Sequence, residues 1–203
     1  MKNEWENQSV NFDHVYSGDG FLNRVPYFGS FVRKSLTERM ERAIAFAEPC
    51  DGKTIIDLGC GVGRIALEIA RRGALVIGYD ISIDAITIAS QQAKEAGLDG
   101  RCTFQHGDLE VLNFPPADAW IDLGCLQYVR DIEHILTKLK NVKHCYSTLP
   151  RRGYWLNPIR FLYRGILKGS PFYTYNQDDV RKLFGMYSGL NIEEDRGVHH
   201  ITA

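Results

Sequence analysis

The sequence predicts an α/β protein with a doubly wound sheet of about seven strands, mostly parallel, with helices on both faces and an antiparallel hairpin at the carboxyl end. Short segments that are apolar along their whole length alternate with amphipathic segments of helical periodicity. Strands of that kind are buried on both faces, as in a parallel sheet covered by helices. Glycines and acids follow several of the apolar segments, at the sheet edge where α/β proteins bind ligands.

The composition is that of one globular domain covering residues 1–203. Of these residues, 44% are apolar, and 24 Lys and Arg balance 25 Asp and Glu to a net charge of -1. This balance excludes a general attraction to nucleic acid or acidic membranes, although it leaves a local basic patch open. No apolar run approaches the roughly 18 residues of a membrane span, and the start of the chain is polar, so we expect a cytoplasmic protein. The five cysteines form no CxxC pair, which predicts buried thiols and no metal site.

The first three quarters of the chain alternate between helices and strands. Apolar residues recur at helical spacing from Val32 to Ala47, and Pro49 stops this helix. Helical periodicity returns three times, with Ser82 and Asp131 as N-caps of the last two helices. These helices are expected at 64–72, 83–96 and 132–139. Strands are expected at 54–58, 74–79, 102–105, 119–123 and 142–148.

The pattern changes after the fifth strand. Residues 149–175 contain three prolines and several glycines, which predicts an excursion from the core, and we assign 150–175 to the substrate side. Asn176 then caps a helix that has Asp179 at its third position. Two closing strands, at 190–194 and 198–202, read as an antiparallel hairpin.

A glycine-rich turn after the first strand carries the main functional signal. It reads Asp57-x-Gly59-x-Gly61-x-Gly63 and leads into a helix. Three glycines at alternate positions allow backbone to approach a ligand closely, and the helix start supplies free N–H groups. A dinucleotide fingerprint would need a small residue at position 64, where the chain has Arg64, so hydride transfer is disfavoured. A glycine turn that holds no ligand remains the structural alternative.

Over residues 54–148 the chain resembles class I S-adenosylmethionine (SAM)-dependent methyltransferases, which have a Rossmann-like fold. The resemblance implies that Asp57 serves the ammonium group of SAM, that Asp80 accepts both ribose hydroxyls, and that Asp108 accepts the exocyclic amine of adenine. The order of these acids after successive strands is that of the family. The cofactor site implied in this way consists of Tyr16, Asp57, Gly59, Cys60, Gly61, Gly63, Asp80, Ile81, Asp108, Leu109 and Leu123.

The end of the fourth strand resembles the family motif that faces the methyl group to be transferred. Many small-molecule members have Glu-His there, whereas this chain has Gln127-Tyr128, so a histidine base is absent. If the acceptor is a hydroxyl, Asp122 and Tyr128 are the candidate bases. Asp122 is alternatively a group that only stabilises the positive end of SAM. Metal-dependent members need an Asp-Asn pair where this chain has Ser147-Thr148, so no metal is expected.

Two flanking segments are candidates for contact with the acceptor. The basic, aromatic stretch after the fifth strand is expected to meet it through Arg151, Arg152, Tyr154 and Trp155, with a solvated amphipathic helix as the alternative. Because of this basic patch, RNA binding and peripheral membrane binding remain alternatives, although the net charge disfavours nucleic acid. Residues 1–29 are expected to form a lid in which Tyr16 lies near the methionine end of SAM, unless they are an ordinary hydrophobic tether.

The sequence thus predicts SAM-dependent methyl transfer to a small molecule by in-line displacement without metal. We expect O-methylation of an apolar or aromatic acceptor that bears an anionic group. The overall plan looks like that of quinone-pathway and magnesium-protoporphyrin O-methyltransferases. The alternatives are a non-catalytic protein that binds SAM or a partner, and an RNA methyltransferase. The sequence makes no prediction of the oligomeric state.

Overall fold

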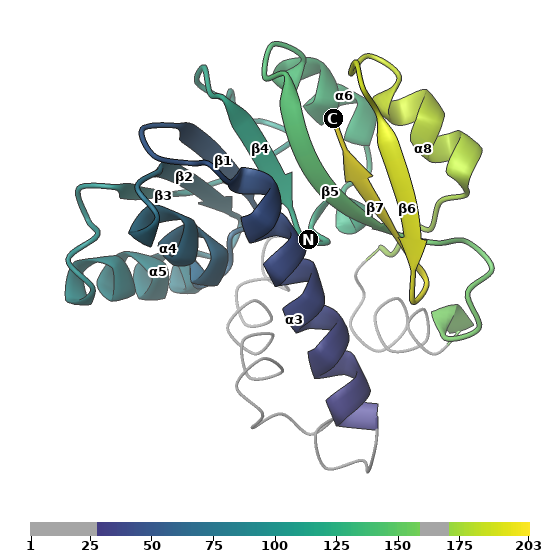
Figure 1. Ribbon diagram of the computed structural model, residues 1–203, viewed down its shortest axis with the longest axis horizontal. Coiled ribbons are helices and arrows are strands. Elements are labelled where there is room, and N and C mark those ends of the chain that lie inside the picture. Colours follow the sequence, from purple (N-terminus) through teal and green to yellow (C-terminus); the bar gives the residue numbers. More distant parts are fainter. Residues whose placement is uncertain (1–27, 159–170) are drawn as a thin grey trace.

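A computed structural model describes residues 28–158 and 171–203, the first six of them by backbone alone. The strands in these residues form one seven-stranded sheet in the order β3-β2-β1-β4-β5-β7-β6 (Figure 1). The strands are β1 (Thr54–Leu58), β2 (Leu75–Asp80), β3 (Cys102–His106), β4 (Ala119–Asp122), β5 (His144–Pro150), β6 (Asn191–Asp195) and β7 (Val198–Thr202). The helices are α3 (Phe28–Ala47), α4 (Arg64–Arg71), α5 (Ile83–Glu95), the 3-10 turn η2 (Leu126–Tyr128), α6 (Ile132–Leu139) and α8 (Gln177–Phe184).

The predicted fold class is confirmed. Strands β1 to β5 are parallel, whereas β7 pairs antiparallel with both β5 and β6. Strand order reverses direction at β1, and β4 lies on its other side. This reversal is the point at which an open α/β sheet leaves a crevice at its carboxyl edge.

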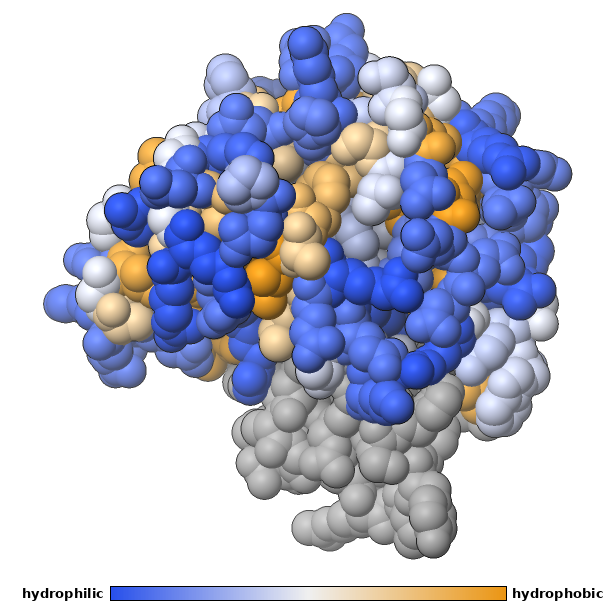
Figure 2. Space-filling model, in the orientation of Figure 1, coloured by the Kyte–Doolittle hydropathy of each residue, from blue (hydrophilic) through white to orange (hydrophobic). Residues whose placement is uncertain are grey.

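Two apolar layers hold the sheet between the helices. Helices α3, α4 and α5 cover one face, where Ile55, Ile121 and Tyr146 are buried. Helices α6 and α8 cover the other face, where the alternate residues Ile56 and Trp120 are buried. The continuous burial that marked these strands in the sequence therefore arises because both faces are covered. On the side seen in Figure 2, hydrophilic residues predominate and apolar residues appear in smaller groups between them.

The helix caps follow the sequence closely. The Ser82 hydroxyl accepts from Ala85 N, and the Asn176 and Asp179 side chains form a reciprocal capping box. Strand β5, however, begins at His144 rather than at residue 142, because Val142 N donates to Leu139 O and closes the end of α6. Its other end extends to Pro150, because β7 pairs alongside it there.

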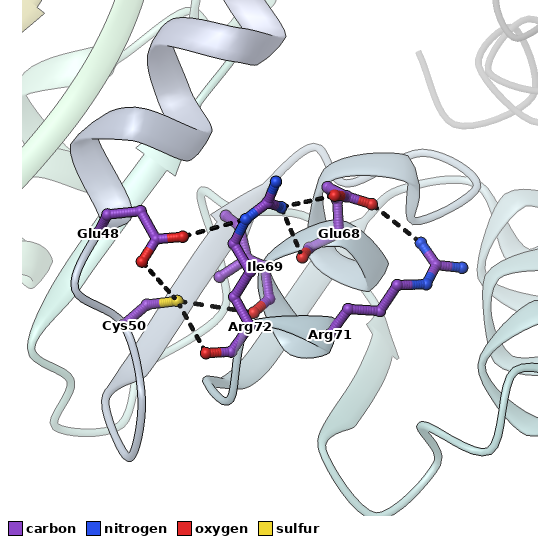
Figure 3. Close-up of polar contacts among 6 residues, drawn as sticks. All are labelled: Glu48, Cys50, Glu68, Ile69, Arg71 and Arg72. Atoms are coloured by element: carbon purple, nitrogen blue, oxygen red, sulfur yellow. Dashed lines mark hydrogen bonds and ion pairs between the residues drawn. The ribbon is translucent and has the colours of Figure 1, made fainter.

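Charged groups gather at the amino edge of the sheet, defined here as the C-terminal end of α4 and the chain before β1. Arg72 pairs with Glu68 at 2.6 Å and with Glu48 at 3.0 Å, and Arg71 pairs with Glu68 at 3.1 Å (Figure 3). The buried thiol of Cys50 lies 3.5 Å from Arg72 O beneath this network. Burial, and then the charge of Glu48, raise the pKa of this thiol.

Parts of the expected plan lie outside the described residues. Tyr16 and the rest of the expected lid up to residue 27 are among them, whereas residues 28 and 29 begin α3. The middle of the expected excursion, residues 159–170, is also outside. Of the helices within 28–158 and 171–203, none is both long enough and apolar enough to cross a bilayer.

Candidate active site

A cavity opens at the carboxyl edge of the sheet, defined here as the turns that follow β1 to β4. The structure brings most of the predicted site residues to this cavity. Those that line it are Asp57, Gly59, Cys60, Gly61, Asp80, Ile81, Asp108, Leu109, Leu123 and Tyr128. They come from four segments that are separated along the chain, so the parallel sheet is what brings them together.

The first glycine turn is built by close backbone packing. Gly59 has a φ of +68°, and a side chain there would collide with Cys125. The Gly59 and Cys60 N–H groups both donate to Tyr79 O, at 2.8 and 3.0 Å, which ties the turn to the end of β2. Gly61 also has a positive φ, +53°, but no atom of the described residues lies within 4 Å of where its Cβ would be. The cavity wall at Gly61 is therefore bare backbone, open to a ligand.

Gly63 differs from the other two glycines. It does not line the cavity; a Cβ there would lie 2.9 Å from the ring of Phe104 and 3.1 Å from Ala89. Its φ of +82° begins α4 without a side-chain cap. The structure therefore places Gly63 in the packing of α4 against α5 and β3 rather than in the predicted contact with a ligand.

Two buried carboxylates face the cavity from β1 and β2. Asp57 is 3% exposed and Asp80 is 7% exposed. Asp80 accepts from Gly61 N and from Ser82 N, both at 2.9 Å, so each of its oxygens is oriented and keeps a further lone pair. In the described part of the chain, neither carboxylate has an ion-pair partner.

Burial makes ionisation of these acids unfavourable. Desolvation, and then repulsion by Asp122 and Asp80, raise the pKa of Asp57 from 3.8 to about 8. Desolvation also raises the pKa of Asp80, against the opposing effect of its backbone hydrogen bonds. A ligand that brings positive charge or hydroxyl donors into this cavity would relieve both costs.

The turn after β3 presents a third acid. Asp108 lines the cavity, and its Oδ1 accepts from Glu110 N at 2.9 Å. No hydrogen bond of the described residues uses Oδ2, so this oxygen can accept from a ligand donor. Leu109 follows it and is 6% exposed. Gly107 N donates to Asp80 O, which holds this turn beside the end of β2. A flat ring between a carboxylate and a leucine side chain fits this arrangement.

The structure does not bring Asp122 to the cavity. Its side chain is fully buried; Oδ1 accepts from the N–H groups of Gly124, Cys125 and Leu126, and Oδ2 accepts from Ser147 Oγ at 2.8 Å. Desolvation raises its pKa to about 6, although these hydrogen bonds oppose the shift. Asp122 therefore organises the turn after β4 and has no face from which to take a proton from an acceptor.

Tyr128, the other predicted base, does lie at the cavity. It belongs to η2, and its ring centroid is 6.2 Å from that of Phe172. Tyr173 N donates to Gln127 O at 3.0 Å, so the end of the excursion packs back onto this wall. Within the described part of the excursion, Phe172 and Tyr173 thus meet the cavity wall.

The predicted acceptor-binding residues lie elsewhere. Arg151 pairs with Glu194 at 3.3 Å, and Arg152 pairs with Asp179 at 2.9 Å. The Tyr154 ring packs against Gly197, and the Trp155 side chain is 71% exposed. None of Arg151, Arg152, Tyr154 and Trp155 lines the cavity. The two arginines pair instead with two acids distant in sequence, on β6 and α8.

The structure adds residues that the sequence did not assign to the site. Leu36, Arg39 and Met40 reach the cavity from α3, and Arg64 and Arg130 line it as well. Helical periodicity had indicated Leu36 and Met40, but only as members of an apolar helix face. Arg64 directly follows the glycine turn, but in the sequence it served only as evidence against a dinucleotide site. Nothing in the sequence relates the positions of Arg39 and Arg130 to this turn.

Comparisons with known proteins match the segment that supplies most of this cavity. Residues 50–149 match the family model described as a methyltransferase domain. The ubiquinone biosynthesis O-methyltransferase of Rhizobium johnstonii is 32% identical over 110 residues, which cover 53% of this chain and 44% of that protein. The 23S rRNA (uracil(1939)-C(5))-methyltransferase RlmD of Azoarcus is 40% identical over 107 residues, covering 47% of this chain and 25% of that protein. The chain thus spans less than half the length of these curated relatives.

A solved structure shares the fold over almost the whole chain. It is magnesium protoporphyrin IX methyltransferase from Synechocystis with bound S-adenosylhomocysteine (SAH). The TM-score is 0.76, with 21% sequence identity, and the match covers 99% of this chain and 97% of that one. At this identity the likeness establishes the fold.

Proposed function

The chain carries a SAM-dependent methyltransferase domain, and from that premise we propose that the protein transfers the methyl group of SAM to a small-molecule acceptor. The observation that carries the proposal is the pair Asp57 and Asp80, two buried carboxylates without an ion pair in the described residues, on either side of a bare glycine turn. SAM offers an ammonium group and a ribose diol, the chemistry that these two acids require. Burying two carboxylates is energetically unfavourable, and in a protein that binds no ligand nothing would compensate for it.

We assign different cavity residues to different parts of SAM. We assign Asp57 to the ammonium group, Asp80 to the ribose hydroxyls, and Asp108 with Leu109 to the adenine. Arg39 is the cation that lines the cavity from α3, and we assign it to the carboxylate of the amino-acid tail. When bound, SAM supplies an activated methyl group, so the protein's main task is to align the acceptor and to exclude water.

The acceptor side of the cavity favours an apolar or aromatic molecule. Tyr128 with Phe172 behind it forms one wall, and Leu36 and Met40 contribute apolar surface from α3. We propose O-methylation, with Tyr128 as the remaining predicted base at the cavity. We expect an anionic group on the acceptor. Because Arg64 and Arg130 line the cavity, we propose that they bind this group, in place of the Arg151 and Arg152 expected from the sequence. In-line displacement on this wall needs no metal in our proposal.

A second candidate is methylation of RNA, favoured by the 40% identity with the rRNA enzyme over about half of this chain. The charge balance of 24 basic and 25 acidic residues opposes it, because RNA binding depends on a surplus of positive charge. All five cysteines are free thiols, and four of them are buried. This supports our proposal that the protein works in the reducing environment of the cytoplasm.

Isothermal titration calorimetry tests the cofactor first. We expect SAM and SAH to bind and NAD to bind far more weakly; tight NAD binding without a SAM signal would refute the proposal. Transfer of a labelled methyl group is then measured with fractionated small metabolites and, separately, with unmodified RNA. Labelled RNA would favour the second candidate, and cofactor binding without transfer to either pool would indicate a non-catalytic SAM-binding protein.

A further inference from the structure

Thr148, near the end of β5, carries a hydroxyl that the described part of the fold leaves without a hydrogen bond. Its side chain is 1% exposed, and Oγ1 has no hydrogen-bond partner among residues 28–158 and 171–203. Its neighbour Ser147 points to the other face and donates to Asp122. Buried hydroxyls without a partner are uncommon because they lose their hydrogen bonds to water, so this one calls for an explanation.

The hydroxyl points toward the cavity wall at Gly124. A Cβ built on Gly124 would lie 3.9 Å from Thr148 Oγ1 and 3.2 Å from Gln127 Nε2. Gly124 and Gln127 line the cavity, and Gly124 has a φ of +94°, which favours glycine there. The missing side chain leaves a notch in the wall with Gln127 Nε2 at its edge. Thr148 does not itself line the cavity; its hydroxyl lies directly behind the notch. We call Gly124, Gln127 and Thr148 the β4–β5 notch.

The polar atoms of the notch suit an uncharged hydroxyl. Gln127 Nε2 carries two N–H groups, and one of them donates to Gly124 O at 2.8 Å. The second can donate to a ligand oxygen, while Thr148 Oγ1 can accept a proton from the same oxygen or donate to it. A ligand hydroxyl fills both roles at once, whereas a methyl group would leave the Thr148 hydroxyl without a partner.

The groups around Thr148 add no net charge of their own. Its partner across the β5–β7 pair is His200, which is 5% exposed and whose Nδ1 lies 2.7 Å from Tyr146 Oη. Desolvation, and then the charges of Arg42 and Arg39, lower the pKa of His200 to about 4, so it is neutral near pH 7. Glu193, which pairs with His200 on β6, is engaged by Arg42 at 2.8 Å. Among the described residues, an ionised ligand atom would find no counter-ion at the notch itself.

We infer that the β4–β5 notch binds a hydroxyl group of the methyl acceptor and so selects hydroxyl-bearing acceptors over their deoxy analogues. This inference rests on the proposed function. Thr148 and Gln127 are positioning and specificity residues in it, and the notch leaves the assignment of the base unchanged.

The first test needs no acceptor. Because its hydroxyl has no partner, Thr148→Val should raise the melting temperature of the full chain by about 2–4 °C, whereas Thr148→Ser, which keeps the hydroxyl, should not. Thr137→Val is the matched control, since Thr137 is an exposed helix residue whose hydroxyl donates to Glu133 O. A melting temperature lowered by Thr148→Val and restored by Thr148→Ser would mean that the hydroxyl stabilises the fold, which overturns the inference.

The second test uses phenol and toluene as probes, titrated by NMR into the full chain saturated with SAH. We expect phenol to bind more tightly than toluene, and Thr148→Val to weaken phenol about 3–10-fold with toluene unchanged. Thr148→Ser should retain phenol binding, and Gln127→Met should weaken it. Equal binding of the two probes, no phenol binding, or an equal phenol affinity in Thr148→Val would overturn the inference. Failure of SAH itself to bind would instead refute the proposed function.

Discussion

The carboxylates at the two edges of the sheet differ in burial and in ion pairing. At the amino edge, Glu48 and Glu68 are partly exposed and each is paired with Arg72. At the carboxyl edge, Asp57 and Asp80 are buried, and the described residues supply no cation within ion-pair distance of either. Helix α4 runs from the carboxyl edge to the amino edge, so the glycine turn and the ion pairs of Arg72 lie only about a dozen residues apart in the chain.

The difference between the two edges indicates that one serves as solvated surface and the other binds a ligand. Exposed ion pairs cost little to form and add little, so the amino edge is a solvated surface that tolerates change. Buried, unpaired acids cost stability and persist where a ligand compensates them. The comparison therefore predicts that substitutions at the carboxyl edge change ligand binding or folding strongly, and that substitutions at the amino edge change neither by much.

The largest effect is expected where the carboxyl edge is most tightly packed. Gly59→Ala should lower the free energy of unfolding by about 2–4 kcal/mol, from the collision with Cys125 and the positive φ. Gly61→Ala is the matched control: it has the same kind of backbone but open space, so it should cost about 1 kcal/mol and mainly impair SAM binding. Urea unfolding measures both. Equal stability losses would contradict the packing difference between the two glycines.

Next in size is the loss of the ribose partner. Asp80→Ala should weaken SAM binding by about 1.5–3 kcal/mol, the usual cost of losing a charged hydrogen-bonding group. Calorimetry gives the dissociation constant, and Asp84→Ala serves as the control because Asp84 is exposed on α5. An unchanged dissociation constant in Asp80→Ala would move the ribose site elsewhere.

The pH dependence of SAM binding tests Asp57 directly. Since its pKa is about 8 and the cation needs the ionised form, SAM affinity should rise by up to tenfold per pH unit toward pH 8 and level off above it. Without ligand the sign reverses, because a raised acid pKa contributes stability at low pH that is lost as the pH rises through 8. Asp57→Asn should flatten this part of both profiles. A wild-type affinity independent of pH between 6 and 8 would show that Asp57 is ionised without SAM.

The smallest effect is expected at the amino edge. Arg72→Ala removes the ion pairs with Glu48 and Glu68 and should lower the free energy of unfolding by less than about 1 kcal/mol. SAM affinity should not change. A loss as large as that of Gly59→Ala would mean that the network around Cys50 is part of the structural core, and the contrast between the edges would disappear.

Much of the fold could be predicted from local sequence, because strands and helices depend on neighbours two to four residues away. The alternation of apolar segments and the caps at Ser82, Asp131 and Asn176 predicted elements close to those observed. The glycine turn and the acids at the strand ends also follow from local pattern, and the parallel sheet gathers them at one edge. The bounds of β5 were less predictable, because its ends depend on α6 and on pairing with β7.

The sequence by itself determined the elements, the fold class and the turns that build the cavity, because each is written in residues close together along the chain. Only the tertiary structure decided which side chains remain available there. Asp122 is hydrogen-bonded within the turn after β4, and Arg151 forms an ion pair with Glu194, 43 residues further on. Arg39 reaches the cavity from α3, a helix that precedes the sheet in the chain. Such partners are chosen by packing and charge between distant segments, and no local spacing encodes them.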